Sequence, residues 1–367
     1  MEKKSEMEQL TEDQISVIRE ITQVDKLVED LKLGKVNGCY LKAFRTMDLI
    51  QKGVQGCSWK SAQDLIAIFT CLGDLLSKAD PVERVPTNMI LRILKGIRDE
   101  YVTASGKKPG SKSTNFDTEE SLTKMMISDD AVIHDYTQPL TDLKENILDY
   151  LNELDSELET SIENIAAKSS EQITSGQVIL TTGKSKSVEA FLKYAAKTMT
   201  FQVIVAESEP SGNGTELANK LAEAGISTQL IPDSAIFAIM PRVNKVIIGT
   251  HSVMANGGLK AISGSYALAY AAKNHSVPLT VCTPIFKITP NYLISHDQVA
   301  FNKFVSPHQV LQFNEAPYAT ETEVVNPVFD YVPPELVNGF VTNWGFYTPS
   351  YVYRLLSELY HRKDYLS

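Results

Sequence analysis

The segment QVILTTGKSKSVEAF, residues 177–191, places a lysine and a serine where nucleotide-binding proteins hold phosphate. A buried strand is expected first, then Gly183, Lys184 and Ser185, then the start of a helix. A phosphate loop needs glycine at both ends, so that backbone N–H groups converge on the phosphates and the lysine reaches the terminal one. Five residues before Gly183 stands Val178, so only half of that pattern is present. The sequence favours an ordinary strand-to-helix turn over a nucleotide site.

The elements that flank this turn belong to an alternating pattern that begins near residue 171. Runs rich in Val, Ile and Leu are typical of strands buried on both faces, and helical segments separate them. Such alternation implies right-handed crossovers and a parallel sheet covered by helices, which is a Rossmann-like domain. In this fold the loops after the strands carry ligands. The expected strands are QVILTT, FQVIVAE, TQLIP, NKVIIGT and PLTVCTP, the expected helices are VEAFLKYAAK, ELANKLAEAG, SAIFAIM and KAISGSYALAYAAKNH, and the loops are TTGKS, AESEPSGNG, GTHSVMANGG and CTPIFK.

The residues before this pattern are expected to be helical, because apolar side chains recur three and four positions apart. Ser58 and Thr87 precede two of these stripes and are expected to cap their helices. Segment 103–120, rich in Gly, Ser, Thr and charge, is expected to be a flexible insertion. Residues 140–168 form one long helix, which either packs on its own domain or connects the two halves. The stripes are Ile15, Ile18, Leu27, Val28 and Leu31, then Trp59, Ala62, Leu65, Ile66, Phe69 and Leu72, then Ile90, Leu94, Ile97 and Tyr101.

The predicted fold class is therefore α/β, with an N-terminal α-helical domain at 1–170 and a Rossmann-like parallel-sheet domain at 171–367. The composition, 43% hydrophobic and 22% charged, is ordinary for a globular protein. A net charge of −10 and a pI near 5.2 argue against nucleic-acid binding, because phosphate contacts need clustered Lys and Arg.

Three features are absent from the sequence: a membrane span, a signal peptide and a metal-ligand motif. No apolar run approaches the ~20 residues of a membrane span, and the charged first residues carry no signal-peptide core, so a cytosolic protein is expected. The four cysteines share no close metal-ligand spacing and are expected to be reduced thiols. The sequence predicts neither a metal site nor a cofactor.

Several long segments of the C-terminal half carry a family resemblance. They are AESEPSGNGTELANKLAEAGI, VNKVIIGTHSVMANGGL, SYALAYAAKNHSVPLTVCTP and NPVFDYVPPEL, in the order that the family has them. In these segments the chain resembles the isomerases of methylthioribose 1-phosphate and ribose 1,5-bisphosphate. It equally resembles their non-enzymatic relatives, the alpha, beta and delta subunits of eukaryotic translation initiation factor 2B.

The residues that the isomerases use are missing at the matching positions. Opening a sugar ring and moving a proton from C1 to C2 needs an acid–base pair, and the phosphate needs cationic and backbone donors. The resemblance implies that an isomerase carries cysteine at Gly183, arginine at Glu209 and aspartate at His251. A carboxylate at the arginine position repels phosphate, although an imidazole can act as a base near neutral pH. The positions of this relic site are Thr182, Gly183, Glu209, His251, Asn256, Gly257, Ala261 and Ile262, of which Asn256 and Gly257 match the isomerases, whereas Ala261 and Ile262 replace an Asn-Lys pair.

The resemblance therefore implies a non-catalytic regulatory subunit of the guanine nucleotide exchange factor for translation initiation factor 2. It implies the delta, alpha, gamma and epsilon subunits as partners in a decamer, with exchange activity in epsilon. It also implies that the helical domain helps to bind initiation factor 2 and to sense phosphorylation of its alpha subunit, the signal of the integrated stress response. Two alternatives stay open, a surviving sugar-phosphate isomerase and a nucleotide-binding protein.

Two further groups of residues are candidates for contacts with other proteins. Gln202, Ile204 and Ile231 are expected beside the face that pairs with delta, although Ile204 is equally well explained as core. Arg92, Lys95 and Arg98 are spaced by three on one helix and are expected on its exposed side. They are candidates for a surface that senses the phosphate, and the alternative is a solvated face without a partner.

Overall fold

The computed structural model describes residues 24–36, 38–57, 59–105, 135–293, 301–312 and 322–365. They divide into two compact units, a helical unit made of the described parts of Met1–Leu158 and Ser357–Ser367, and a second unit, Glu159–Leu356. The second unit is built on a mostly parallel sheet, which confirms the predicted fold class. Ile15, Ile18, Ser58 and most of the insertion 103–120 lie outside the described residues.

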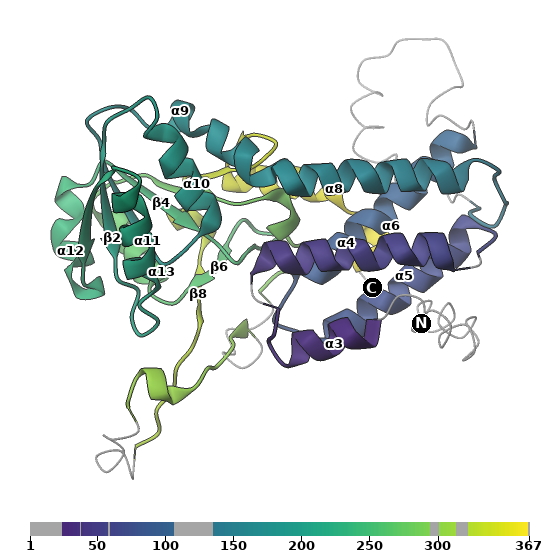
Figure 1. Cartoon of the computed structure of the whole chain (residues 1–367), viewed down its shortest axis with the longest axis horizontal. Coiled ribbons are helices and arrows are strands. Elements are labelled where there is room, and N and C mark those ends of the chain that lie inside the picture. The colour runs from purple at the N-terminus through teal and green to yellow at the C-terminus, as the bar shows by residue number, and fades with distance from the viewer. Residues whose placement is uncertain are drawn as a thin grey trace. The chain divides into compact units, whose positions relative to one another are not determined.

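The helical unit buries the apolar stripes that the sequence predicts. Its helices are α3 (Val24–Lys32), α4 (Cys39–Gly56), α5 (Ala62–Ala79), α6 (Val85–Ala104), most of α8 (Leu143–Ala167) and α16 (Arg362–Tyr365) (Figure 1). α5 and α6 pack along each other, and α4 packs on α6. The buried stripe residues include Leu27, Leu31, Leu65, Phe69, Leu72, Ile90, Leu94 and Ile97.

The starts of α5 and α6 differ from the predicted caps. α5 begins after Ser61, whose Oγ accepts a hydrogen bond from the backbone N–H of Asp64, while the Asp64 carboxylate accepts one from the N–H of Ser61. This capping box satisfies two donors that the first turn leaves free. The prediction that Thr87 caps α6 is wrong, because α6 begins at Val85 with Pro86 in its first turn. Proline fits there because its missing N–H would have no partner inside the helix.

Gly96 allows α6 and α8 to approach closely. A Cβ at Gly96 would lie 2.0 Å from Cε1 of Tyr150, a ring that is largely buried and whose pKa burial raises to about 12. We expect Gly96→Ala to lower the free energy of unfolding by about 1–3 kcal/mol, because the ring must move within a packed core. This loss should exceed the ~1 kcal/mol that alanine gains in a helix interior.

The matched control is Gly73→Ala on α5, where the nearest atom to an added Cβ, Cγ2 of Ile90, is 3.4 Å away. We expect this variant to be as stable as the parent or slightly more stable. Urea denaturation followed by circular dichroism measures both variants. Equal stability of the two would show that Tyr150 does not limit the approach of the helices.

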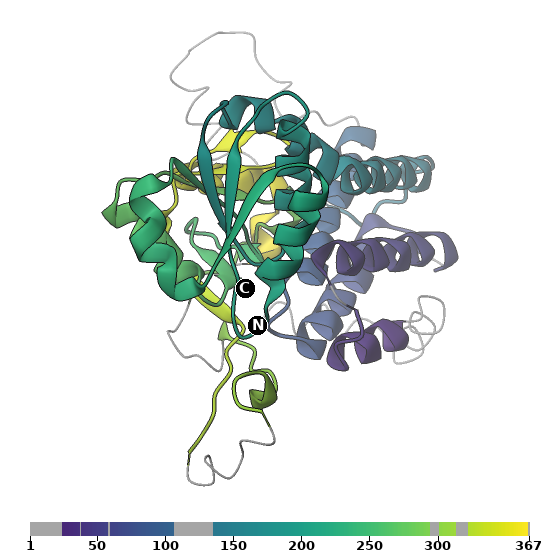
Figure 2. The ribbon, with the colours of Figure 1, turned by 60° about the vertical axis from the view of Figure 1, so that its left-hand side comes forward.

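The second unit has the parallel sheet that the alternating sequence predicts. Among the residues that the structure describes, seven strands form one sheet in the order β10-β9-β7-β4-β1-β2-β3, and only β10 is antiparallel to its neighbour. Helices cover both faces, with α10 and α11 on one and α13 on the other (Figures 1 and 2). The elements are β1 (Val178–Thr182), α10 (Lys186–Ala195), β2 (Gln202–Ala206), α11 (Asn213–Glu223), β3 (Ser227–Ile231), α12 (Ile236–Ile239), β4 (Lys245–Gly249), α13 (Ser265–Asn274), β7 (Leu279–Cys282), β9 (Gly339–Val341), β10 (Phe346–Tyr347) and α15 (Val352–Leu359).

One predicted helix is wrong in its first part. The segment KAISGSYALAYAAKNH was expected to be helical throughout, but α13 begins only at Ser265. Residues Leu259–Ile262 form strand β6, which pairs antiparallel with β5 (Ser252–Val253) and with β8 (Phe329–Val332) in a separate small sheet. Gly264 has φ 92°, a left-handed conformation that ends the strand and admits the helix.

The two faces of the large sheet bury different residues of the same strand. Val203 and Val205 of β2 pack in a cluster with Phe191 of α10 and Leu217 of α11. Successive side chains of a strand point to opposite faces, so Ile204 points to the other face. It is 1% exposed there. Ile204 is therefore core within this unit.

Candidate functional site

The Gly-Lys-Ser turn after β1 joins two helices through its lysine. Gly183 has φ 65°, the left-handed conformation that favours glycine. The Nζ of Lys184 lies 2.6 Å from the carboxylate of Glu216 on α11, and Ser185 caps α10 by accepting a hydrogen bond from the N–H of Val188. Hydrogen bonds from Lys184, and next from Lys220, lower the pKa of Glu216. The lysine charge is thus paired within the protein, as expected for a structural turn.

The loop after β2 also uses its donors internally. The backbone N–H groups of Ser208 and Glu209 donate to the two carboxylate oxygens of Asp233, at 3.0 and 2.8 Å. Ser208 has φ 60° and is buried, whereas the Glu209 side chain is exposed. A phosphate at this loop would need the same two N–H donors that the Asp233 carboxylate already occupies. The negative charges of Asp233 and Glu209 would also repel it.

Gly183 and Ile262 lie close together in the structure. A Cβ at Gly183 would lie 3.4 Å from Cγ2 of Ile262 and 3.8 Å from Oγ of Ser208. Ala261, next to Ile262 in β6, is fully buried and pairs with Asp330 of β8. An apolar side chain therefore faces the turn at Gly183.

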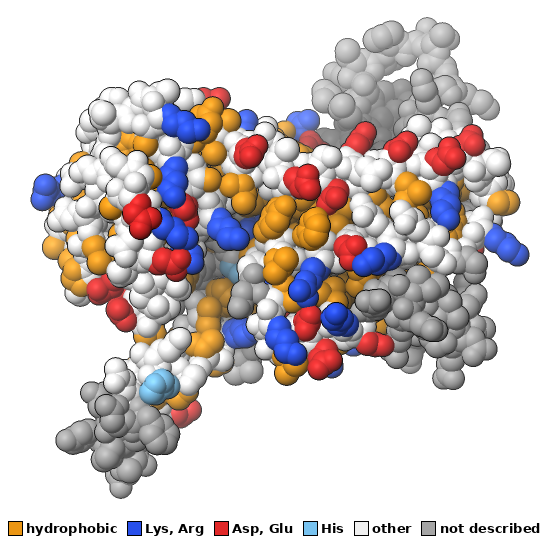
Figure 3. All heavy atoms as spheres, viewed as in Figure 1, with side chains coloured by type: hydrophobic (Ala, Val, Ile, Leu, Met, Phe, Trp, Pro, Cys, Tyr) orange, Lys and Arg blue, Asp and Glu red, His pale blue; other side chains and the backbone are white. Residues whose placement is uncertain are grey.

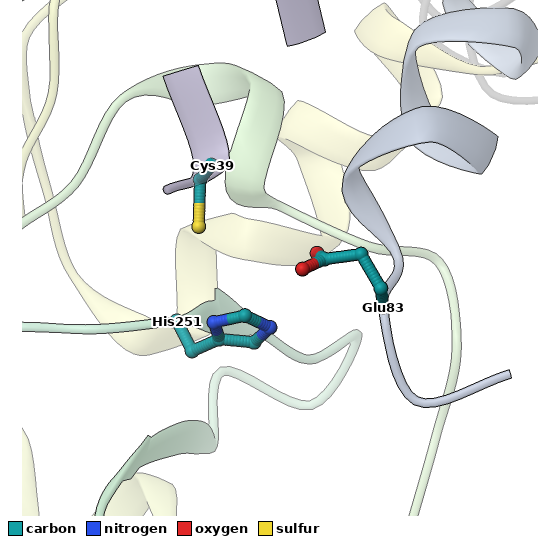
Figure 4. A group of neighbouring side chains, drawn as sticks. All are labelled: Cys39, Glu83 and His251. Carbon is teal, nitrogen blue, oxygen red and sulfur yellow. The ribbon is translucent and has the colours of Figure 1, made fainter. Parts of the chain in front are cut away.

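His251 lies in a polar and aromatic setting after β4. Its backbone N–H donates to the carbonyl of Lys260, and its ring centroid is 4.6 Å from that of Phe329 (Figure 4 labels the side chain). The Lys260 Nζ lies 4.7 Å from the Phe329 centroid and 5.0 Å from that of Phe301. The sequence did not single out Lys260, because its segment was predicted to be helical. A cation shared with aromatic faces is a stabilising contact.

Asn256 and Gly257 make local contacts in the turn that follows β5. The Asn256 amide donates to the hydroxyl of Tyr331 at 2.8 Å, and its carbonyl accepts from the N–H of Gly258 at 2.9 Å. Gly257 has φ 81°, and a Cβ there would lie 2.9 Å from the carbonyl oxygen of Pro349. Both residues therefore have a structural role in this turn.

Two of the four cysteines, Cys57 and Cys282, are buried. Cys57 belongs to the helical unit and Cys282 ends β7, and both have free thiols. Burial raises the pKa of each thiol above its ordinary value. Because the thiolate is the nucleophile, this burial disfavours the reactive form of both side chains.

The three cations of α6 are not the exposed face that their spacing suggested. Arg92 and Arg98 are 9% and 8% exposed, and each holds a carboxylate, Glu157 for Arg92 and Asp364 for Arg98. Burial alone would lower the pKa of Arg92, but Glu157 more than offsets this and raises it. The prediction of an exposed side is therefore wrong for both arginines, because their partners come from distant parts of the sequence.

Positive and negative side chains are mixed on the surface of the described residues. Lys and Arg side chains are interspersed with Asp and Glu on the described residues of the face drawn in Figure 3. Another ion pair of the helical unit joins Lys42 of α4 to Glu83, which precedes α6 and whose side chain Figure 4 labels. Among the described residues, no helix is both long enough and apolar enough to cross a membrane.

The fold and the site together define a class of protein that has a Rossmann-like unit and a helical unit. In the loops after β1 and β2 of the Rossmann-like unit, polar groups pair with residues of the same unit. The chain belongs to the Initiation factor 2 subunit family, whose model matches residues 35–349. It is 40% identical to the translation initiation factor eIF2B subunit beta of Dictyostelium discoideum over 93% of this chain and 96% of that protein.

Further similarity is to proteins of the same type. The beta subunit of Schizosaccharomyces pombe is 34% identical, over 95% of this chain and 98% of that protein. The tetrameric eIF2B-beta2-delta2 complex of C. thermophilum contains a chain of the same fold, with a TM-score of 0.68 and 25% identity over 96% of this chain and 99% of that chain. These comparisons confirm the family resemblance that the sequence motifs indicate.

Proposed function

We propose that the chain is a non-catalytic regulatory subunit, of the beta type, in the guanine nucleotide exchange factor of translation initiation factor 2. The observation that carries the proposal is its 40% identity to a beta subunit, along almost the whole length of both proteins. The relic site supports it, because Ile262 faces Gly183 and Asp233 takes the N–H groups of Ser208 and Glu209.

The proposal includes the partners of that complex. Delta is the first of them, because the related chain of C. thermophilum comes from a complex of beta and delta subunits. Alpha, gamma and epsilon complete a decamer in the cytosol, with epsilon supplying nucleotide exchange. The helical domain, 1–170, helps to bind initiation factor 2 and sense its phosphorylated alpha subunit, while the Rossmann-like domain, 171–367, pairs with delta.

Purification of the tagged chain from its own cells tests this proposal. We expect mass spectrometry to find the delta, alpha, gamma and epsilon subunits and initiation factor 2 in the purified material. An untagged lysate is the control. A chain that purifies alone, or without delta, would contradict the assignment.

We expect the purified chain to show no isomerase turnover with ribose 1,5-bisphosphate or methylthioribose 1-phosphate, measured as formation of the ketose. The triple variant Gly183→Cys, Glu209→Arg, His251→Asp should also stay inactive, because Ala261 and Ile262 still stand in place of the Asn-Lys pair of the isomerases. The result that contradicts this is turnover by the unmodified chain that disappears in His251→Ala.

The contact residues remain part of the proposal. Gln202, Ile204 and Ile231 are proposed near the delta seam, and Lys95, which unlike Arg92 and Arg98 is not buried, is proposed near the surface that responds to phosphorylation. Lys95, which is half-buried, is the most suitable residue for an exchange assay with phosphorylated initiation factor 2, because its Nζ donates to two backbone carbonyls and its replacement does not strand a buried carboxylate. Weaker inhibition of Lys95→Glu than of Lys52→Glu on α4 would support the sensing role, and equal inhibition would contradict it.

A further inference from the structure

Residues 357–365 belong to the helical unit, although the whole second unit separates them from it in the sequence. Leu359 and Tyr360 are each 2% exposed, so the segment has apolar anchors. Burial raises the pKa of the Tyr360 hydroxyl, which keeps it neutral. These anchors place the segment against the unit, but apolar contacts have no direction and do not fix its register.

Lys95 contacts the segment where a helix ends. Its Nζ donates to the carbonyl oxygens of Ser357 at 2.8 Å and Glu358 at 2.7 Å, in the last turn of α15. The last carbonyls of a helix have no partner within it, and they form the negative end of the helix dipole. A single ammonium therefore satisfies two of these carbonyls and neutralises that end.

Arg98 contacts the segment six residues further on. Its two terminal nitrogens lie 2.8 and 3.3 Å from the two carboxylate oxygens of Asp364 on α16. The Arg98 and Asp364 side chains are only 10% and 8% exposed, so water screens the pair weakly. Arg98 also lies 5.8 Å from the ring centroid of Tyr136. A buried pair of this kind is costly to break from one side, because the remaining charge loses its partner.

Lys95 and Arg98, spaced by three on α6, thus hold two points of one segment, while Arg92 holds α8 through Glu157. We propose that residues 357–365 are a clasp that closes the helical unit, and that Lys95 and Arg98 of α6 are placed to receive it. The clasp opens as a local unit when the Arg98–Asp364 pair is broken. Its opening leaves Lys95 and Arg98 without their partners in this segment.

Hydrogen–deuterium exchange of the full chain tests this proposal. In Asp364→Asn the amides of residues 357–365 should exchange at least about tenfold faster, because the guanidinium loses a charged partner. Amides of β2, Gln202–Ala206, should exchange as in the parent. Lys363→Gln is the matched control, since it changes the charge of an exposed neighbour on the same helix.

The exchanged pair Arg98→Asp with Asp364→Arg separates the pairing from a loss of fold. It should restore at least part of the protection of residues 357–365, whereas each single variant should lose it. Exchange in Asp364→Asn that equals Lys363→Gln would overturn the clasp. Faster exchange throughout both units would overturn it as well, because a clasp that opens locally leaves β2 protected.

Discussion

Replacing Ile204 with aspartate is expected to unfold the Rossmann-like unit. Ile204 is 1% exposed and lies opposite Leu180 on β1 and Gln229 on β3, in the interior of the sheet. A carboxylate at this position loses its water without gaining a partner, which costs about 4 kcal/mol or more. Since whole domains are stable by about 5–15 kcal/mol, that loss removes much of the stability. Circular dichroism on heating measures it.

Gln202→Glu is the control, because Gln202 stands at the half-buried start of the same strand. We expect this variant to fold, so its binding to delta can be measured by pull-down. Reduced binding would support the proposed seam at Gln202. A soluble Ile204→Asp protein with the melting temperature of the parent would show that the strand tolerates a charge, contrary to the burial that the structure assigns.

Gly214→Ala is expected to have the second largest effect. A Cβ at Gly214 would lie 2.0 Å from the carbonyl oxygen of Ala206 and 2.9 Å from the carbonyl carbon of Glu207. These are backbone atoms at the end of β2, and the N–H of Gly214 donates to the Glu207 carbonyl at 3.0 Å. A rotamer change cannot relieve the clash, so α11 must move away from the sheet. We expect a loss of about 3 kcal/mol or more in the free energy of unfolding, measured in urea.

Thr215→Ala tests the same turn of α11 without the clash, since Thr215 is exposed. It should remain within about 0.5 kcal/mol of the parent, as surface substitutions usually do. A Gly214→Ala protein as stable as Thr215→Ala would mean that α11 can shift freely on the sheet.

The strands of the large sheet were predictable because they are buried on both faces. Consecutive Val and Ile residues in β2 and β4 leave no helical period, and the structure has strands at all five predicted runs. β6 was not predictable in the same way, because Leu259–Ile262 is short and continues into a true helix. Its partners, β5 and β8, lie on both sides of it in the sequence, and β8 is far away.

The candidate site was predictable in its residues but not in its contacts. The motif comparison identified Gly183 and Ile262, and the structure places them together. It gave no sign of Asp233 or Lys260, because neither belongs to a pattern that the sequence makes visible. The burial of Arg98 is a similar case, since helical spacing says which residues share a face but not that Asp364, 266 positions away, covers it.

Because the helical unit contains residues from both before and after the Rossmann-like unit, it is synthesised in two parts. A ribosome adds roughly 5–20 residues per second, so the stretch Glu159–Leu356 takes roughly 10–40 s to translate. Throughout that interval α3 to α6 have left the ribosome, but Ser357 to Asp364 do not yet exist. During that interval Lys95 and Arg98 cannot yet bind Ser357, Glu358 and Asp364, and the Rossmann-like unit has time to fold first. Synthesis of the helical unit thus begins before that of the Rossmann-like unit and is completed after it.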